Sequence, residues 1–185
     1  MLRYGMSVLA LVASALLLTS VYAGGTLKSG PQVGQDVPGP FHPLNVTGEK
    51  AGKKNCLYCS NGGNPVAVVF AREATPAVAK LLKQLDEATV KNGKAEMGSY
   101  AVFCSDKDGL DKTLTKLATE QKLTKLILSI DNPAGPEKYG ISKDADVTVV
   151  LYTEFQVKAN PTFRKGELPA AAITKVVADV TKIVK

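Results

Sequence analysis

The sequence predicts an α/β fold, with a central mixed sheet of about five strands flanked by helices. Short runs of apolar, β-branched residues alternate along the chain with longer segments whose apolar residues recur at helical spacing. Strands that alternate with helices are joined by right-handed crossovers and therefore run parallel. Two late strands with a tight connection predict a hairpin instead. The expected order is strand, helix, strand, helix, three strands and a closing helix.

Residues 1–23 have the features of a secretory signal peptide. Arg3 supplies the positive start, Met6 to Leu18 is an almost uninterrupted apolar run, and Val21 to Ala23 places small residues around a cleavage site. The run is shorter than the roughly 20 apolar residues of a membrane span. We therefore expect cleavage, with no stable membrane span afterwards; an uncleaved anchor is the alternative. Export predicts a periplasmic or extracellular location, where close cysteines persist as disulfides.

The remaining chain divides into a flexible lead-in, residues 24–40, and one domain, residues 41–185. The lead-in is rich in Gly, Pro and Ser. The whole chain carries a net charge of +6, of which Arg3 in the signal contributes one. The only local basic cluster is Lys50, Lys53 and Lys54, and no aromatic residues alternate with it to stack on bases. No nucleic-acid partner is expected.

The first strong strand is Pro65 to Ala71, a continuous apolar run typical of a strand buried on both faces. Thr75 and Pro76 predict a helix start, because Thr caps well and Pro is tolerated at the first helical position. Asn92-Gly93 predicts where this helix ends. Its apolar stripe is Val78, Leu81, Leu82 and Leu85.

Tyr100 to Cys104 is the next predicted strand, and Leu126 to Ile130 is the third. Asp108 is the expected N-cap of the helix between them. The apolar stripe of that helix is Leu110, Leu114, Leu117 and Ala118.

Val147 to Tyr152 is the fourth predicted strand, and Phe155 to Ala159 alternates in the way of a strand that pairs with it at the sheet edge. Tyr139-Gly140-Ile141 is a short turn or helical piece before them. The last helix runs from about Pro169 to Val184.

This order and its landmarks resemble the redoxin branch of the thioredoxin-like superfamily, which includes peroxiredoxins and secreted relatives. The lead-in Val33 to Pro38 and the strand Asn64 to Phe70 are similar to the stretch before the family's core and to its first core strand. Tyr139-Gly140-Ile141 sits where such proteins often carry Tyr-Gly-Val or Tyr-Gly-Ile. The resemblance covers about Val33 to Lys182. It implies a thioredoxin-like fold for residues 41–185.

Two departures from the family pattern concern its chemistry. The family's attacking cysteine lies in the turn after the first core strand, where a helix N-terminus favours the thiolate. Residues 71–78 contain no cysteine here. The family's cis-proline falls at Val147, and because a cis bond before a non-proline residue costs about 2.5–4 kcal/mol, we expect a trans Asp146–Val147 peptide. The resemblance therefore implies a degenerate primary active site.

Cys56-Leu57-Tyr58-Cys59 is the main candidate for chemistry. It precedes the first core strand, so it is expected near the N-terminal end of that strand, whereas Cys104 ends the neighbouring strand at the opposite rim. About six residues at 3.3 Å each separate the rims by roughly 20 Å. A disulfide needs Cα atoms within about 7 Å, so Cys104 is not expected to bridge. It is predicted to be a small buried residue at a strand end; the alternative is a single reactive thiol.

Three roles remain open for Cys56 and Cys59. They could form a local structural disulfide, an exchangeable redox pair, or part of a metal site with His42. By analogy with other CxxC pairs, Cys56 would attack and Cys59 would resolve. No second CxxC or CxxH completes a zinc site, so neither a metal nor a cofactor is expected.

Taken together, the residues predict an exported redoxin-like protein with Cys56 and Cys59 as its candidate catalytic residues. If active, it would be a thiol–disulfide oxidoreductase that acts on other proteins. The alternative is a non-catalytic binding or structural module in which Cys56–Cys59 is a structural disulfide. Such a module would hold a partner protein at the face where the family carries its active site, around Arg72, Thr75, Cys104 and Val147.

Overall fold

The computed structural model describes residues 27–184. Its strands are β1 Leu44–Asn45, β2 Val66–Ala71, β3 Gly98–Cys104, β4 Ile127–Asp131, β5 Val147–Thr153, β6 Gln156–Ala159 and β7 Thr162–Phe163. Its α-helices are α1 Leu57–Asn61, α2 Pro76–Lys91, α3 Leu110–Glu120 and α4 Ala170–Ala178; the 3₁₀ helices are η1 Gly93–Ala95 and η2 Asp179–Lys182. The predicted signal peptide lies outside the described residues. No helix among those residues is long and apolar enough to cross a membrane.

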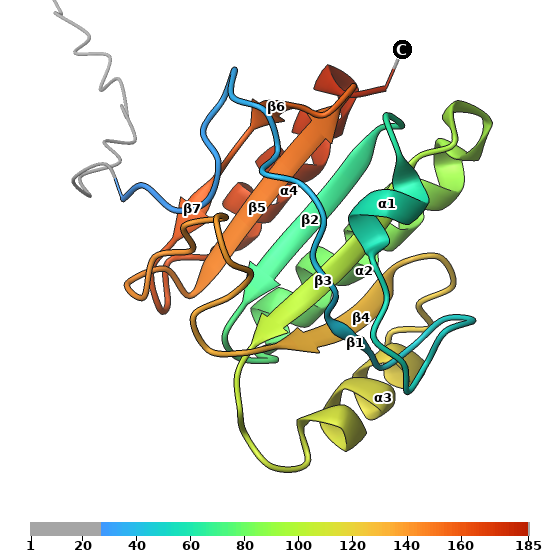
Figure 1. The fold of residues 1–185 in the computed structure, drawn as a ribbon, viewed down its shortest axis with the longest axis vertical. Helices are drawn as coiled ribbons and strands as arrows, with labels where there is room; N and C mark the ends of the chain where they lie inside the picture. Colours follow the sequence, from blue (N-terminus) through green and yellow to red (C-terminus); the bar gives the residue numbers. More distant parts are fainter. Residues whose placement is uncertain (1–26, 185) are drawn as a thin grey trace, which may run out of the picture.

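One mixed sheet forms the centre of the molecule (Figure 1). Its strand order is β1-β4-β3-β2-β5-β6, and β7 also pairs with β5. Strands β2, β3 and β4 are parallel, as their alternation with helices predicts, whereas β5 and β6 run antiparallel to their neighbours. The predicted α/β class and the late hairpin are therefore confirmed.

The two faces of the sheet are covered differently. Residues of β2 that point to one face, such as Val69, pack against the apolar stripes of α2, α3 and α4. The opposite face, which carries Phe70 and Tyr100, is covered by Phe41, Leu57 and other residues outside the long helices. In Figure 1, α2 and α4 lie behind the sheet and α1 lies in front of it. All six residues of β2 are buried, as its continuous apolar pattern predicts.

The predicted cap of α2 is confirmed, but that of α3 is not. Thr75 caps α2, and its Oγ1 accepts a hydrogen bond from the Val78 N–H at 3.3 Å. The prediction that Asp108 caps α3 is wrong: the N-cap is Gly109, at φ 71°, and no side chain caps the helix. Glycine adopts this left-handed conformation without the penalty that a Cβ brings. The last predicted helix is divided into α4 and η2.

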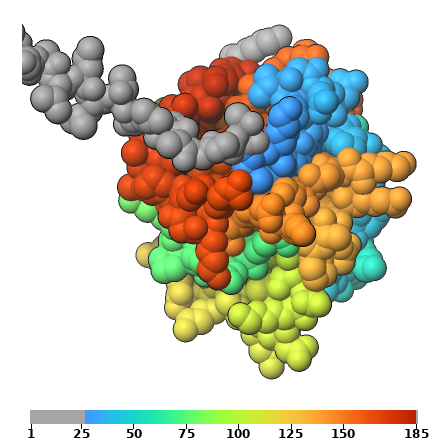
Figure 2. Space-filling model, turned by 90° about the vertical axis from the view of Figure 1, so that its left-hand side faces the viewer, coloured from blue at the N-terminus to red at the C-terminus, as the bar shows by residue number. Residues whose placement is uncertain are grey.

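Part of the predicted lead-in lies along the hairpin edge of the sheet. The Gly34 N–H donates to the Val157 carbonyl at 2.9 Å, and the Val37 N–H donates to the Phe155 carbonyl at 2.8 Å. These bonds cover the outer edge of β6, which would otherwise present unpaired backbone groups. Figure 2 shows this blue segment seated against the orange and red surface of the later chain. The boundary after residue 40 stays a prediction.

Candidate functional site: a disulfide at the start of a short helix

Cys56 and Cys59 form a disulfide with their Cα atoms 5.2 Å apart. Cys56 is the N-cap of α1, in an extended conformation, and Cys59 follows in the first turn. A helical turn returns the chain after about three residues, so this spacing brings the two side chains together. The Cys59 N–H donates a hydrogen bond to the Cys56 Sγ at 3.1 Å. The disulfide therefore pins the first turn of α1.

Packing holds α1 against the sheet. Leu57 is buried beneath the helix, and the Tyr58 ring lies 5.5 Å from that of Phe155, centroid to centroid. Gly98, the first residue of β3, lies against the other end of the helix: an added Cβ there would lie 1.8 Å from the Asn61 Oδ1, so the Asn61 side chain would have to move. These contacts place α1 at the rim where β2 and β3 begin.

The third cysteine is at the opposite rim. Cys104 is the last residue of β3, whereas Gly98 beside α1 is the first. The disulfide and Cys104 therefore lie at opposite ends of one strand, as predicted. Cys104 forms no disulfide.

The two disulfide cysteines differ in exposure. Cys56 is 8% exposed and belongs to the core residues, whereas Cys59 is exposed to solvent. The CxxC spacing alone carries no signal for this difference, because the orientation of a helix as short as α1 is set by tertiary packing. The contacts of Leu57 and Tyr58 turn Cys56 toward the protein and leave Cys59 facing water.

Burial makes Cys104 a poor nucleophile. It is 3% exposed, and its Sγ lies close to Gly135 of the loop before Tyr139. Burial raises the pKa of the Cys104 thiol to about 12, against the opposing effect of the nearby Arg72 charge. The thiolate is the reactive form, so Cys104 is the buried strand-end residue that the sequence predicts.

We expect Cys104 to resist alkylation in the folded protein. With the disulfide intact it is the only free thiol among the described residues. Iodoacetamide at pH 8 should modify it at least about tenfold more slowly in native protein than in urea-unfolded protein, because the folded thiol is both protonated and shielded. Intact-mass measurements over time report the rate. Equal native and unfolded rates would contradict the burial assignment.

Arg72 lies in the turn between β2 and α2, where the resemblance to redoxins implies an active-site position. Its guanidinium donates three hydrogen bonds to backbone carbonyls, from Nε to Ala145 at 2.9 Å, from Nη1 to Pro133 at 2.9 Å and from Nη2 to Ser142 at 3.0 Å. The Arg72 N–H also donates to the Asp146 carbonyl at 3.0 Å. Arg72 thus ties three carbonyls of the loop between β4 and β5 together. All described peptide bonds, including Asp146–Val147, are trans.

A groove of about 450 Å³ lies beside this turn, where α2 begins. At its edge Glu73 and Lys165 form an ion pair at 2.9 Å, and the Lys165 ammonium lowers the pKa of Glu73. Burial, with the Glu73 charge, raises the pKa of Asp146. The groove is lined by Thr75, Pro76, Ala77, Val78, Asp146, Val147, Lys165, Gly166 and Leu168. It has the size for a small side chain or peptide segment and presents no thiol.

Across residues 27–184, no group of three or more His, Cys, Asp and Glu side chains is placed to hold a metal ion. His42 is exposed, and both cysteines of the CxxC motif are used by the disulfide. The predicted alternative of a metal site with His42 therefore has no geometric support.

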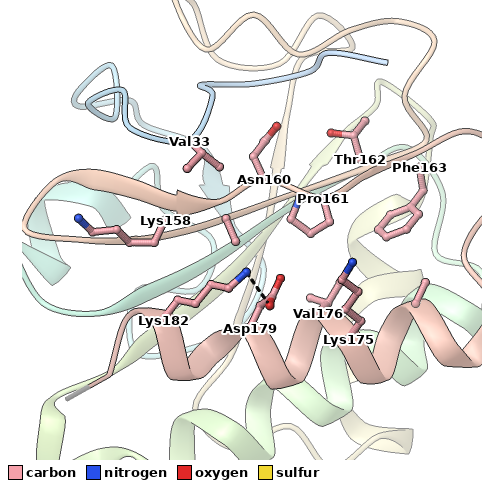
Figure 3. Close-up of a pocket in the computed structure, with 12 residues that line it drawn as sticks. Val33, Lys158, Asn160, Pro161, Thr162, Phe163, Lys175, Val176, Asp179 and Lys182 are labelled. Carbon is pink, nitrogen blue, oxygen red and sulfur yellow. Dashed lines mark ion pairs between the residues drawn. The ribbon is translucent and has the colours of Figure 1, made fainter. Parts of the chain in front are cut away.

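A second hollow of about 470 Å³ lies between α4 and the segment 158–163 (Figure 3). Lys158, Lys175 and Lys182 line it over an apolar floor that includes Phe163. Lys182 is paired with Asp179 at 2.8 Å. The lysines would suit an anionic group, and no cysteine lines this hollow.

We expect the disulfide to make a modest contribution to global stability. It closes a loop with a sequence separation of only 3. Chain-entropy estimates for so short a loop give about 2 kcal/mol. We expect the Cys56→Ser, Cys59→Ser double variant to lose about that amount in urea unfolding while remaining folded. A loss as large as the total stability would instead make the disulfide indispensable to the fold.

Comparison with known proteins supports the fold assignment. No protein-family profile and no curated protein sequence matches this chain. A candidate protein disulfide isomerase from Bacteroides thetaiotaomicron superposes with a TM-score of 0.64 at 15% identity, over 85% of this chain and 94% of that one. Peroxidoxin BcpB from Mycobacterium tuberculosis gives 0.57 at 15% identity, over 86% and 99%. A yeast mitochondrial 1-Cys peroxiredoxin gives 0.58 at 10% identity, over 80% and 73%.

Identities this low compare folds rather than activities. The superpositions cover 85% and 86% of this chain, so the likeness extends over most of its fold. The predicted resemblance is confirmed at this level: the chain has the thioredoxin-like fold of the redoxins and peroxiredoxins.

Proposed function

We propose that the protein is a thiol–disulfide exchange protein that acts through Cys56 and Cys59. The observation that carries this proposal is a disulfide with one solvent-exposed cysteine, on a short helix of a thioredoxin-like fold. An accessible sulfur is the first requirement for exchange. A second requirement is a sulfur that can leave as a stabilised thiolate. The hydrogen bond from the Cys59 N–H to the Cys56 Sγ supports this, because it stabilises a thiolate at Cys56 when the disulfide opens.

The proposal includes a degenerate primary active site. The turn where redoxins carry their attacking cysteine holds Arg72 and Thr75 here. The Arg72 guanidinium donates hydrogen bonds to loop carbonyls, and Thr75 is the N-cap of α2. Val147 occupies the position of the usual proline and is buried. Cys104, the nearest thiol to this face, is held protonated by burial. These observations favour the disulfide on α1 as the place where exchange occurs.

Export and protein partners belong to the same proposal. The apolar Met6 to Leu18 segment with its cleavage pattern supports secretion, and a persistent disulfide suits an oxidising compartment. The substrates would be cysteine-bearing proteins rather than nucleic acids. Mass measurement of the N-terminus of the exported protein would test cleavage after Ala23.

Two measurements test the exchange proposal. The first is the reduction potential of the Cys56–Cys59 pair against glutathione or dithiothreitol buffers, expected above about −300 mV for an exchangeable pair. The second is catalysed reduction of a disulfide-bonded peptide, compared among wild type, the Cys56→Ser, Cys59→Ser variant and Cys104→Ala as the matched control. Activity should vanish in the double variant and persist in Cys104→Ala. A potential below that range, with no activity beyond the double variant, would leave a structural disulfide.

A non-catalytic binding role is the second candidate, and the groove at Thr75 and Val147 is the observation that favours it. A variant with all three cysteines replaced should then still complement a strain from which the gene has been deleted. Leu168→Asp, which places a charge in the groove, should not. The opposite pattern, with loss only on removing the cysteines, would reject the binding role.

A further inference from the structure

We propose that exchange enters through Cys59: a partner thiolate attacks the Cys59 Sγ, and Cys56 leaves. This assignment rests on the proposed function and adds its direction. It reverses the order expected by analogy with other CxxC pairs, in which the first cysteine attacks and the second resolves. The reversal comes from how α1 is packed in this fold.

Access to the back of each sulfur determines the direction. A thiolate attacks a disulfide sulfur in line with the S–S bond, from the side away from the leaving sulfur. Cys56 is only 8% exposed and is followed by the buried Leu57, so little of it is open to an external thiolate. Cys59 is exposed in the first turn of α1, so its sulfur is the one that an external thiolate can reach.

The neighbouring backbone favours Cys56 as the leaving group. Its Sγ already accepts the Cys59 N–H at 3.1 Å, and a hydrogen bond to the charged form stabilises a thiolate. A better-stabilised thiolate leaves faster. Burial of Cys56 opposes this effect, since it disfavours a charged sulfur. With the two influences on the leaving group opposed, access remains the deciding term.

The chemistry balances as two exchanges. A substrate dithiol loses one proton to water, and its thiolate bonds to the Cys59 Sγ as the Cys59–Cys56 bond breaks and its electron pair leaves on Cys56. The second substrate thiol then loses its proton to water, and its thiolate attacks the substrate sulfur of this mixed disulfide and releases the Cys59 thiolate. The Cys56 and Cys59 thiolates take up the two protons from water. The substrate is oxidised by two electrons to a disulfide, and the Cys56/Cys59 pair is reduced by two. Reduction of a substrate disulfide follows the same steps in reverse, with the Cys59 thiolate as the attacking group.

Single-cysteine variants test the direction. In a Cys104→Ala background, Cys56→Ser leaves only Cys59 among the described cysteines, and Cys59→Ser leaves only Cys56. Each is mixed with the aromatic disulfide DTNB in native buffer and again in denaturant, and release of the coloured thiol gives the rate. We expect Cys59 in the first variant to react at least about tenfold faster than Cys56 in the second, with the rates converging in denaturant. Equal native rates, or a faster Cys56, would overturn the proposal.

A measurement on the wild type guards against a variant that fails to fold. The protein is fully reduced, exposed briefly to limiting iodoacetamide at neutral pH, denatured, and labelled with a second reagent. Peptide mass analysis then gives the share of first label on each cysteine, which should lie mainly on Cys59. A majority on Cys56 would overturn the assignment.

Failure of the direction and failure of the proposed function give different results. If Cys59 reacts preferentially but the wild type shows no catalysed exchange, the direction holds and the proposed function fails. If the wild type catalyses exchange but Cys56 is labelled first, the function holds and the direction fails.

Discussion

Replacing Asp86 by alanine should destabilise the protein by about 3–4 kcal/mol, the largest loss we expect from one polar side chain. Asp86 lies on α2, is 1% exposed, and accepts hydrogen bonds from the chain that enters β4. Its Oδ1 accepts the N–H groups of Thr124, Lys125 and Leu126 at 3.0, 2.7 and 2.8 Å. Without the carboxylate these donors lose their partner, and α2 is no longer tied to the start of a central parallel strand.

Urea unfolding measures this loss. With a slope of about 2 kcal/mol/M, the midpoint should fall by roughly 1.5–2 M. The matched control is Glu87→Ala at the next position, an exposed carboxylate whose ion pair with Lys83 at 3.4 Å is worth less than about 1 kcal/mol. Asp86→Asn, which keeps one acceptor oxygen and the shape, should lie between the two. If Asp86→Ala unfolded at the midpoint of Glu87→Ala, the bonds would not have the assigned strength.

The sequence gives no sign of this role for Asp86. An acidic residue inside a helical pattern is expected on the solvent side. Its three partners are about forty positions away along the chain, at Thr124, Lys125 and Leu126. Only the tertiary fold, which places α2 beside the loop before β4, shows that the carboxylate is buried and bonded.

The strands and helices that sequence reasoning found are those with strong local patterns. Pro65 to Ala71 is apolar throughout and became the fully buried β2, and Thr75-Pro76 marked the start of α2. The elements that it missed have no such pattern. β1 is two residues that pair with β4, and β7 is two residues that pair with β5, so both exist through distant partners.

The positions of the three cysteines along the sheet could be predicted from the order and direction of the strands. Strand direction alone places Cys56 and Cys59 at one rim and Cys104 at the other, because parallel crossovers fix which end of each strand is which. The exposure of each sulfur was not predictable. It depends on α1, a helix of five residues. This helix is held by the burial of Leu57, by the Tyr58–Phe155 ring contact and by the packing of Asn61 against Gly98.

Arg72→Ala should loosen the loop between β4 and β5, with a loss of about 2–3 kcal/mol. The guanidinium is the shared donor for the carbonyls of Pro133, Ser142 and Ala145, which all belong to the loop between β4 and β5. These are charge-assisted bonds. Truncation removes the Arg72 donor from the Pro133 and Ala145 carbonyls, whereas the Ser142 carbonyl still accepts the Ala145 N–H at 3.1 Å. Because Gly135 of the same loop lies against the Cys104 Sγ, loosening the loop should also expose this thiol.

Alkylation of Cys104 in the native protein separates this loop role from a general loss of stability. Native alkylation of Cys104, with the Cys56–Cys59 disulfide intact, should become at least about tenfold faster in Arg72→Ala, since local opening costs less free energy than global unfolding. Arg72→Lys keeps the charge but has one donor head in place of a planar fork, so it should recover only part of both effects. Arg164→Ala, at an exposed position, is the matched control and should resemble wild type. Unchanged Cys104 labelling in Arg72→Ala would show that the loop is held by its other contacts and that Arg72 does not order the face around it.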